Sequence, residues 1–497
     1  MIDLLFGNIN LYILVIIFFG VSFGIITAAL PGITISTSMA VLLPFTYYMD
    51  SLSSFGLLLG VFTGGMAGGA ISAILINIPG NPAAVVTNLS GYAFTIRGKA
   101  HYAIGLAQIA SIIGSFFGWI VLFLISAELS QFTIKFGAVE QCVLIFFGLC
   151  LVSLMTESSL IKGYISMFFG LTLATIGLDP ISATPRFDYG QVYLQAGIPY
   201  IPVMVGIFGL PSIFEDFFSK KKDILFNVST SIKTCLVGFY DALKQTFLRS
   251  KLNILISSII GVIIGAIPGA GSTIAATISY NIIKKMEKST DQDQIDSQLV
   301  IAPESANSSL SGGALIPTLT LGIPGDGITA VLLGALMIHG LTPGPLLIVS
   351  NPEIYYGILG VFLIGIIFLA IQSVIFAPLF MQTIKIPNKY LMTLIFIFSV
   401  LGTFAVRNSI TDIWIMLIFG LLGFFMIRNN FPVLPMLLAL ILGEMFEQQF
   451  RMSLIISLGD PLIFFKKPIS LTILMCLFLF FAYKLFLIIK PKLRKYV

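Results

Sequence analysis

Small and polar residues follow four Pro-Gly pairs that lie inside apolar sequence, at 31–32, 79–80, 268–269 and 324–325. A Pro-Gly pair ends a helix, and the helix that restarts after it points free backbone N–H groups and a positive dipole end at the break. Such a helix start suits a carboxylate or a phosphate, and glycine lets the ligand approach the backbone. The residues predicted to bind this anion are Gly32, Thr34, Ser36, Gly80, Asn81, Gly269, Ser272, Thr273 and Gly325.

Three further residues in or beside the broken segments, Asn77, Asn307 and Asp326, are predicted to hold a coupling cation together with backbone carbonyls that the breaks leave free. Ionisable groups at membrane depth are costly and mark functional sites. Asp326 directly follows the fourth break, while Glu304 follows Pro303. Either carboxylate could instead cap a helix near the membrane surface.

The elements that carry these residues are predicted to be membrane helices. Of the 497 residues, 57% are hydrophobic and 10% are charged, and the mean hydropathy is +1.03, whereas a soluble domain has roughly 25% charged residues. A span needs about 20 apolar residues, which predicts an all-α polytopic membrane protein with about ten to twelve spans. One break could merely kink a packed helix, but two matched pairs of breaks favour broken helices or re-entrant hairpins around a binding site.

Loop charges predict that the two pairs of breaks belong to repeats of opposite orientation. At three equivalent places the loop of one repeat contains lysine or arginine and the loop of the other contains neither. Residues 1–9 and 47–51 contain neither, whereas their counterparts 214–252 and 284–304 are basic. After the second break the order is reversed, because 97–99 contains both and 341–353 contains neither. By the positive-inside rule this is an inverted-topology repeat. The predicted organisation is a first repeat (1–100), connecting membrane helices (101–213), a basic cytoplasmic segment (214–252), a second, inverted repeat (253–350) and C-terminal membrane helices (351–497).

The sequence gives little indication of catalysis, nucleic-acid binding or metal binding. Its two histidines, His101 and His339, form no HExxH motif, and neither a serine-protease string nor a P-loop occurs. The net charge of +5 is spread over loops and does not indicate nucleic-acid binding. The four cysteines lack CxxC spacing and are predicted to be small buried hydrophobes. We therefore expect no enzyme and no cofactor. The first apolar segment lacks the features of a removed signal peptide and is predicted to be a retained span.

An ordered set of motifs resembles the large membrane subunit of the tripartite tricarboxylate transporters, the TctA-like family. The resemblance covers most of the chain. Its motifs are Leu30-Pro31-Gly32, Leu43-Pro44-Phe45-Thr46, Gly68-Gly69, Ile76-Asn77-Ile78-Pro79-Gly80, Gly91-Tyr92, Arg97-Gly98-Lys99, Gly177-Leu178-Asp179-Pro180, Pro185-Arg186-Phe187, Pro268-Gly269-Ala270-Gly271, Ala302-Pro303-Glu304, Gly312-Gly313-Ala314, Leu321-Gly322-Ile323-Pro324-Gly325 and His339-Gly340-Leu341-Thr342-Pro343-Gly344-Pro345.

The resemblance implies secondary uptake of a carboxylate across the bacterial inner membrane, driven by Na⁺ or H⁺. A periplasmic solute-binding protein would deliver the substrate, and a small four-helix membrane subunit would complete the complex within the lipid bilayer. Asp326 departs from the family pattern, in which a small or hydroxyl residue is expected, so it either faces a cation or shifts substrate choice away from a tricarboxylate. We expect an alternating-access permease subunit. The alternative is a passive anion channel or a membrane scaffold subunit.

Overall fold

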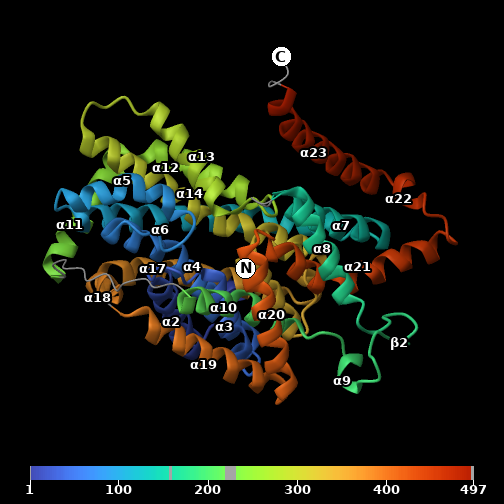
Figure 1. Ribbon diagram of the computed structural model, residues 1–497. Helices are drawn as coiled ribbons and strands as arrows, with labels where there is room; N and C mark the ends of the chain where they lie inside the picture. The colour runs from blue at the N-terminus through green and yellow to red at the C-terminus, as the bar shows by residue number, and fades with distance from the viewer. Residues whose placement is uncertain (1, 156–158, 219–230, 385, 494–497) are drawn as a thin grey trace. The chain divides into compact units, whose positions relative to one another are not determined.

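Helices make up nearly all of the described chain. The computed structural model describes residues 2–155, 159–218, 231–384 and 386–493 (Figure 1). Within these residues, twenty-three helices accompany a single two-stranded antiparallel sheet, in which β1 (Gly177–Leu178) pairs with β2 (Pro185–Arg186). The predicted all-α membrane fold is thereby confirmed.

Eight helices of the described chain are long and apolar enough to cross a membrane, or nine if two helices that meet at 88° count as one broken span. The eight are α2 (Leu11–Ala28), α4 (Ser51–Ile76), α6 (Ala100–Thr133), α7 (Ala138–Met155), α17 (Pro352–Ile375), α19 (Asn388–Arg407), α20 (Ile410–Arg428) and α21 (Val433–Ile456). The number is below the predicted ten to twelve. Several apolar segments of the sequence fold as helices that are too short to span by themselves.

Each predicted repeat folds as four helices, with one Pro-Gly break between the first and second helices and another between the third and fourth. The first repeat comprises α2, α3 (Ile35–Thr46), α4 and α5 (Ala84–Ile96), and the second comprises α12 (Lys251–Gly265), α13 (Gly271–Met286), α14 (Gln292–Leu321) and α15 (Gly327–Ile338). The backbone is left-handed at equivalent places in both. Gly32 has φ 98° and Gly269 has φ 81°, while Asn77 (φ 59°) ends α4 as Gly322 (φ 71°) ends α14.

The first and third helices of each repeat pack closely through glycines at equivalent positions. A Cβ atom on Gly68 would lie 2.5 Å from the carbonyl oxygen of Ile25, and one on Gly313 would lie 2.4 Å from that of Val262. Both distances are too short for a side chain, so the helix backbones touch. The glycine clusters of the sequence therefore serve close helix packing, as small residues do in membrane proteins.

Loops that the charge pattern assigns to the same membrane face contact each other. Arg97 Nη1, after the first repeat, lies 2.7 Å from Asp293 Oδ1 in the second repeat, and Lys99 also pairs with Asp293. On the face predicted to be opposite, Asn8 Nδ2 donates to Glu353 Oε2 at 3.4 Å. The inverted arrangement places the residues of each contact on one membrane face, so the contacts are consistent with it. The opposite orientation of the two repeats stays a prediction that they support.

The segment 214–252, expected to be a basic cytoplasmic loop, is largely helical where the structure describes it. α10 (Tyr200–Phe218) extends into it and α11 (Ile232–Arg249) fills its second half, whereas 219–230 lie outside the described residues. α11 meets α12 at 88°, buries Cys235 and Ala242, and exposes Leu236 and Tyr240. This amphipathic pattern suits a helix that lies along a membrane surface.

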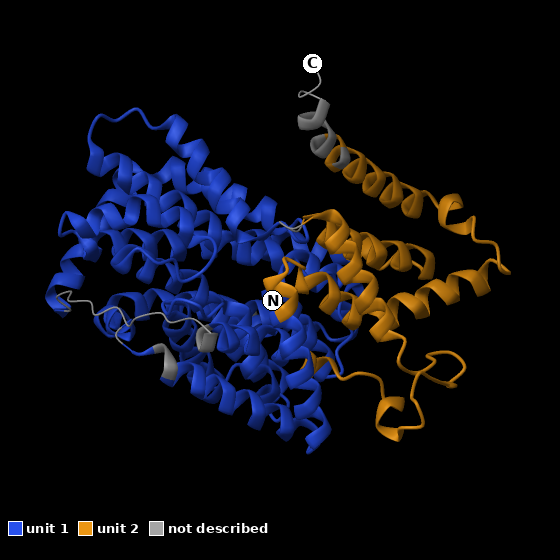
Figure 2. Ribbon diagram, in the orientation of Figure 1, with its two compact units in different colours: residues 1–130, 204–424 blue, residues 131–203, 425–497 orange. Residues whose placement is uncertain are grey.

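The chain forms two compact units (Figure 2), of which unit 1 comprises 1–130 and 204–424 and contains both repeats. Unit 2 comprises 131–203 and 425–497, and there α7 and α8 (Leu160–Ala174) pack against α21, while α23 (Pro468–Leu493) packs on α7. The predicted segments 101–213 and 351–497 are thus each divided between the units. The remaining helices are α1 (Ile2–Phe6), α9 (Val192–Gln195), α16 (Pro345–Ser350), α18 (Ala377–Thr383) and α22 (Ile463–Lys466).

The loop 177–197 of unit 2 is held by charged side chains. Arg186 donates two hydrogen bonds to the Glu447 carboxylate, at 2.7 and 3.0 Å, and Arg451 lies 2.8 Å from Asp179. Backbone N–H groups of Ser182 and its neighbour donate to Asp179 and hold the pKa of that carboxyl below its usual value. These contacts fix the loop against α21.

Three of the four cysteines are buried, as predicted. They are Cys142, Cys150 and Cys235. The prediction is wrong for Cys476, which is exposed on α23. Exposure on an apolar helix is compatible with contact to lipid, since a membrane helix does not need to bury its apolar side chains in protein.

Candidate functional site

The two Pro-Gly breaks within each repeat lie against each other. A Cβ atom on Gly80 would be 2.0 Å from the carbonyl oxygen of Ala28, directly before the first break. In the second repeat, a Cβ atom on Gly325 would be 2.9 Å from the carbonyl oxygen of Gly265, and the amide of Gly269 donates to the Gly325 carbonyl at 2.8 Å. The contacts join equivalent positions. Both breaks of each repeat therefore meet as bare backbone.

The helix that follows the second break of each repeat packs on the helix that follows the first break of the other repeat. α15 of the second repeat packs on α3 of the first, and a Cβ atom on Gly327 would lie 3.1 Å from Ser36 Oγ. α5 of the first repeat packs on α13 of the second, where Ala83 shares a buried cluster with Ala276 and Tyr280. The two breaks of each repeat thus touch, the fourth break contacts the start of α3, and the second break contacts the interior of α13; we call this set of contacts the break ring. Among the predicted anion-binding residues, Ser36 of the first repeat lies beside the fourth break of the second repeat.

Three of the four helices that restart after a break begin with a side-chain acceptor. Thr34 Oγ1 accepts from Thr37 N at 3.1 Å, and Asn81 Oδ1 accepts from the N–H of Ala84, the first residue of α5, at 2.8 Å. Asp326 Oδ1 accepts from Thr329 N at 2.8 Å, as part of a capping box. These side chains satisfy N–H groups that a ligand would otherwise have to satisfy.

The fourth helix start is different. α13 begins at Gly271, and the structure forms no side-chain hydrogen bond at its cap. The half-buried Ser272 and Thr273 follow in its first turn. The start of α13 therefore combines N–H groups that lack a side-chain acceptor with two hydroxyl donors, which together can receive an anion.

Asp326 caps the start of α15. Its carboxylate accepts from the N–H groups of Ile328 and Thr329 and from the Thr329 hydroxyl at 2.9 Å. Asn81 caps α5 at the equivalent position of the first repeat. The helix cap that the sequence left as an alternative is thus what the structure forms, and the N–H groups of the helix start offset part of the cost of burying the Asp326 carboxylate.

The structure does not bring the three residues of the predicted cation site together. Asn307 lies inside α14, where its Nδ2 donates to the Met66 carbonyl at 2.9 Å, whereas Asp326 follows the end of that helix. The chain turns back after α14, because a Cβ atom on Gly325 would lie 2.9 Å from the Cβ atom of Ala314, so Asp326 follows a residue that packs roughly 10 Å from Asn307 along α14. Asn77 ends α4, well beyond Met66, and its carbonyl accepts from Asn88. Asn77 is eleven residues from Met66, roughly 16 Å along α4, which is too far for Asn77 and Asn307 to share one ion. That Asp326 or either asparagine binds a coupling cation stays a prediction.

A buried carboxyl group was not among the predicted ligands. Glu304 is 1% exposed, and its carboxylate accepts from Thr87 Oγ1 at 2.5 Å and from Ser111 Oγ at 3.4 Å. The alternative that Glu304 caps a helix at an interface is wrong, because α14 begins at Gln292 and Glu304 lies in its interior. The available signal was a carboxylate followed by the small and polar run 305–309, without a basic residue beside it.

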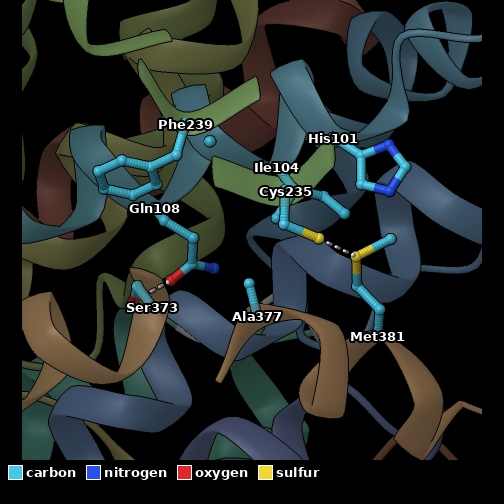
Figure 3. Close-up of a pocket in the computed structure, with 9 residues that line it drawn as sticks. His101, Ile104, Gln108, Cys235, Phe239, Ser373, Ala377 and Met381 are labelled. Carbon is cyan, nitrogen blue, oxygen red and sulfur yellow. Dashed lines mark hydrogen bonds between the residues drawn. The ribbon is translucent and has the colours of Figure 1, made fainter. Parts of the chain in front are cut away.

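Polar groups surround Glu304 within unit 1. Asn307 Oδ1 and Ser308 Oγ, on the next turn of α14, are buried and form no hydrogen bond in the part of the chain that the structure describes. On α6, Gln108 donates to the Ala67 carbonyl at 3.0 Å and accepts from Ser373 Oγ at 2.8 Å (Figure 3). The unsatisfied Asn307 Oδ1 and Ser308 Oγ are places where a water molecule or an ion can bind.

A small cavity adjoins this region. It has a volume of about 10 Å³ and is lined by residues of α6, α11, α17 and α18, among them His101, Gln108, Cys235 and Ser373 (Figure 3). A cavity of that size holds about one water molecule. Ser111, which contacts Glu304, lies one turn from Gln108 on α6. The cavity therefore lies along the helix that reaches Glu304.

One protein family matches most of the chain. The tripartite tricarboxylate transporter TctA family matches residues 14–438. An uncharacterized 52.8 kDa protein of Agrobacterium vitis, from the TAR-I ttuC' 3' region, is 32% identical over 458 residues, which are 92% of this chain and 90% of the relative. A second uncharacterized protein of that organism, from the TAR-II ttuC' 3' region, is 34% identical over 175 residues, 35% of this chain and 72% of the relative. No solved structure matches.

Proposed function

The chain belongs to the tripartite tricarboxylate transporter TctA family, and on that premise we propose that it imports an organic carboxylate by alternating access. The family is a transporter component and not an enzyme family, and the apolar helices make this chain a multi-pass membrane protein. The break ring is the observation that supports the proposal most. Irregular backbone at membrane depth is tolerated where it lines a cavity or is buried in protein, and paired broken helices are typical of transporter binding sites.

The proposed substrate contacts follow from the ring. Ser272 and Thr273 donate hydroxyl hydrogen bonds to carboxylate oxygens at the start of α13, and Ser36 does so at the start of α3, beside Gly327. The backbone at Gly32 contributes as well, because Gly32 is exposed and has open space where a side chain would lie. The N–H groups of Gly80 and Gly269 donate instead to the carbonyls of Gly69 and Gly325, and Gly325 is buried. Two carboxylates of one substrate can engage two helix starts, so we favour a di- or tricarboxylate.

The proposed partners follow from the family. TctA proteins work in a tripartite system with a periplasmic binding protein and a small membrane subunit. We infer that this chain does so in the bacterial inner membrane, with uptake coupled to Na⁺ or H⁺. No cofactor other than the coupling ion enters this mechanism.

The test is uptake into proteoliposomes that contain this chain and the small membrane subunit, with the binding protein outside and radiolabelled citrate or succinate as probe. Ser272→Ala and Ser36→Ala should each raise the half-saturation concentration by about fivefold, since each removes a hydrogen bond to a charged group, worth roughly 1 kcal/mol or more. Ser457→Ala, outside the repeats, is the control. Unchanged half-saturation in both variants contradicts the assignment, and uptake that never exceeds equilibration indicates a passive channel.

A further inference from the structure

The carboxyl group of Glu304 joins helices of both repeats inside unit 1. It lies on α14 of the second repeat and accepts hydrogen bonds from Thr87 on α5 of the first repeat and from Ser111 on α6. α6 crosses α14 here in close contact, because a Cβ atom on Gly114 would lie 2.4 Å from the carbonyl oxygen of Ser305. Glu304 is therefore fixed at a three-helix junction.

No basic side chain pairs with Glu304 among the described residues. The titratable side chains on the helices that pack against α14 are Tyr92 on α5, His101, Tyr102 and Glu128 on α6, Lys251 on α12, and Tyr280, Lys284 and Lys285 on α13. α4, α15 and α16 carry none within their bounds. On α14 itself, Asp296 pairs with Arg97, while Lys251, Lys284 and Lys285 are exposed near helix ends. An unpaired carboxylate in such surroundings is strongly disfavoured, and a bound proton removes the cost.

The contacts of Glu304 suit a group that gains and loses a proton. A hydroxyl donates to a carboxylate and accepts from a carboxylic acid, so Thr87 and Ser111 can satisfy both states by rotating their O–H bonds. A hard cation, in contrast, takes about six oxygen ligands, and the carboxyl group has hydrogen bonds from two side chains. The direct 2.5 Å bond from Thr87 also leaves no space for an ion between those two oxygens.

A route for the proton lies on α6. The water-sized cavity beside His101 and Gln108 adjoins the turn before Ser111, which contacts Glu304. On the other side, the unpartnered Asn307 Oδ1 and Ser308 Oγ can bind water one turn along α14. Hydroxyls and bound water are the groups along which protons move to intramembrane carboxylates.

The position of Glu304 also links it to the break ring. α5 begins at the second break and carries Thr87, while α14 carries Glu304 and ends at the fourth break. When one repeat moves against the other, the hydrogen bond between Thr87 and Glu304 must lengthen or break. Loss of that donor disfavours the charged carboxylate, so the protonation state of Glu304 and the relative position of α5 and α14 are thermodynamically linked.

We propose that Glu304 is the proton-binding carboxyl group that couples import of the carboxylate to a proton gradient. This inference rests on the proposed transport function. A proton from the outer side protonates Glu304 when the substrate binds, crosses with the conformational change and dissociates to the inner side. One O–H bond forms and later breaks, and one proton enters per cycle at this site. The first repeat has Leu59 at the equivalent position, so it supplies no second carboxyl group there.

The test separates coupling from transport itself. Proteoliposomes are prepared with this chain and the small membrane subunit and are loaded with a pH-sensitive dye. Radiolabelled citrate and succinate then measure two activities, which are exchange without a gradient and accumulation driven by an imposed pH gradient. Glu304→Gln keeps the size and polarity of the side chain but cannot release a proton. We expect it to retain at least half of wild-type exchange, to lose at least about tenfold in gradient-driven accumulation and to abolish the substrate-dependent dye signal.

Controls make each outcome decisive. Glu140→Gln changes another buried glutamate, whose carboxylate accepts from Gly137 N, and should retain both activities. Accumulation by Glu304→Gln equal to that of Glu140→Gln, or accumulation that follows only a Na⁺ gradient, overturns the proton site while leaving the transport function intact. Absence of exchange in the wild-type protein overturns the transport function instead.

A second variant covers the case in which Glu304→Gln does not fold. Thr87→Val removes the hydroxyl donor and keeps the shape of the side chain, so it disfavours the carboxylate form of Glu304. We expect the midpoint of the pH dependence of uptake to shift upward relative to the wild type. An unchanged midpoint in a folded Thr87→Val protein contradicts the proposal.

Discussion

The two repeats share their backbone and differ in their chemistry. Gly80 and Gly325 make the same close approach to the preceding break, and the first and third helices pack through equivalent glycines. At one position inside the third helix, however, the first repeat has a buried leucine, Leu59, where the second has Glu304. The two repeats therefore share the close glycine contacts that bring the breaks together, whereas the carboxyl group that we assign to coupling occurs in the second repeat alone.

The starts of the four helices that follow the breaks show the same division. α3 begins with a Thr34 side chain that accepts from Thr37 N, while α13 begins with no side-chain acceptor. Asn81 and Asp326 cap α5 and α15 at equivalent positions. Three starts are therefore stabilised from within the protein, and the start of α13 is the one most available to a substrate anion.

The largest expected effect tests the shared backbone. Gly80→Ala would place a Cβ atom 2.0 Å from the Ala28 carbonyl oxygen, whereas Gly325→Ala would place one 2.9 Å from that of Gly265. Backbone atoms cannot move aside as a flexible side chain can, so we expect Gly325→Ala to cost about 1–3 kcal/mol and Gly80→Ala to cost more. Thermal unfolding in detergent and the yield of monodisperse protein measure this.

Gly209→Ala is the matched control, because its Cβ atom would find its nearest neighbour at 3.5 Å, an ordinary contact. Gly80→Ala and Gly325→Ala proteins as stable as this control would show that the close approach of the breaks does not exist in the folded protein.

A smaller effect tests the caps. Asn81→Ala and Asp326→Ala should each lower the free energy of unfolding by about 1 kcal/mol, because each removes an acceptor at a helix start. Asp326→Asn retains an acceptor, so we expect stability and uptake within about twofold of the wild type. Loss of gradient-driven uptake in a stable Asp326→Asn protein would restore the sequence-based assignment of Asp326 to the coupling ion.

The sequence predicted the features that depend on local signals. Apolar composition predicts membrane helices, and the Pro-Gly pairs mark the ends of α2, α4, α12 and α14 because proline and glycine act on the backbone where they stand. Hydropathy alone could not decide which apolar segments are full spans, since α3 and α5 fold as apolar helices that are too short to span by themselves.

The sequence could not predict which side chains meet across helices. Thr87 and Glu304 are far apart along the chain, and their hydrogen bond depends on how α5 crosses α14. The same uncertainty explains why Asn77, Asn307 and Asp326 were grouped as one site. All three lie near breaks or in broken segments, but the packing of α14 on α4 beside Met66 places Asn307 roughly 16 Å along α4 from Asn77.

The most direct test of the account concerns the orientation of the two repeats. Tyr48→Cys and Thr290→Cys place single thiols in the equivalent loops of the two repeats, at exposed positions, in a chain whose exposed native cysteine is removed by Cys476→Ser. A membrane-impermeant maleimide is applied to right-side-out and to inside-out vesicles. Opposite repeats predict that Tyr48→Cys is labelled from the outer side alone and Thr290→Cys from the inner side alone. Labelling of both thiols from the same side would contradict the inverted repeat and the mechanism built on it.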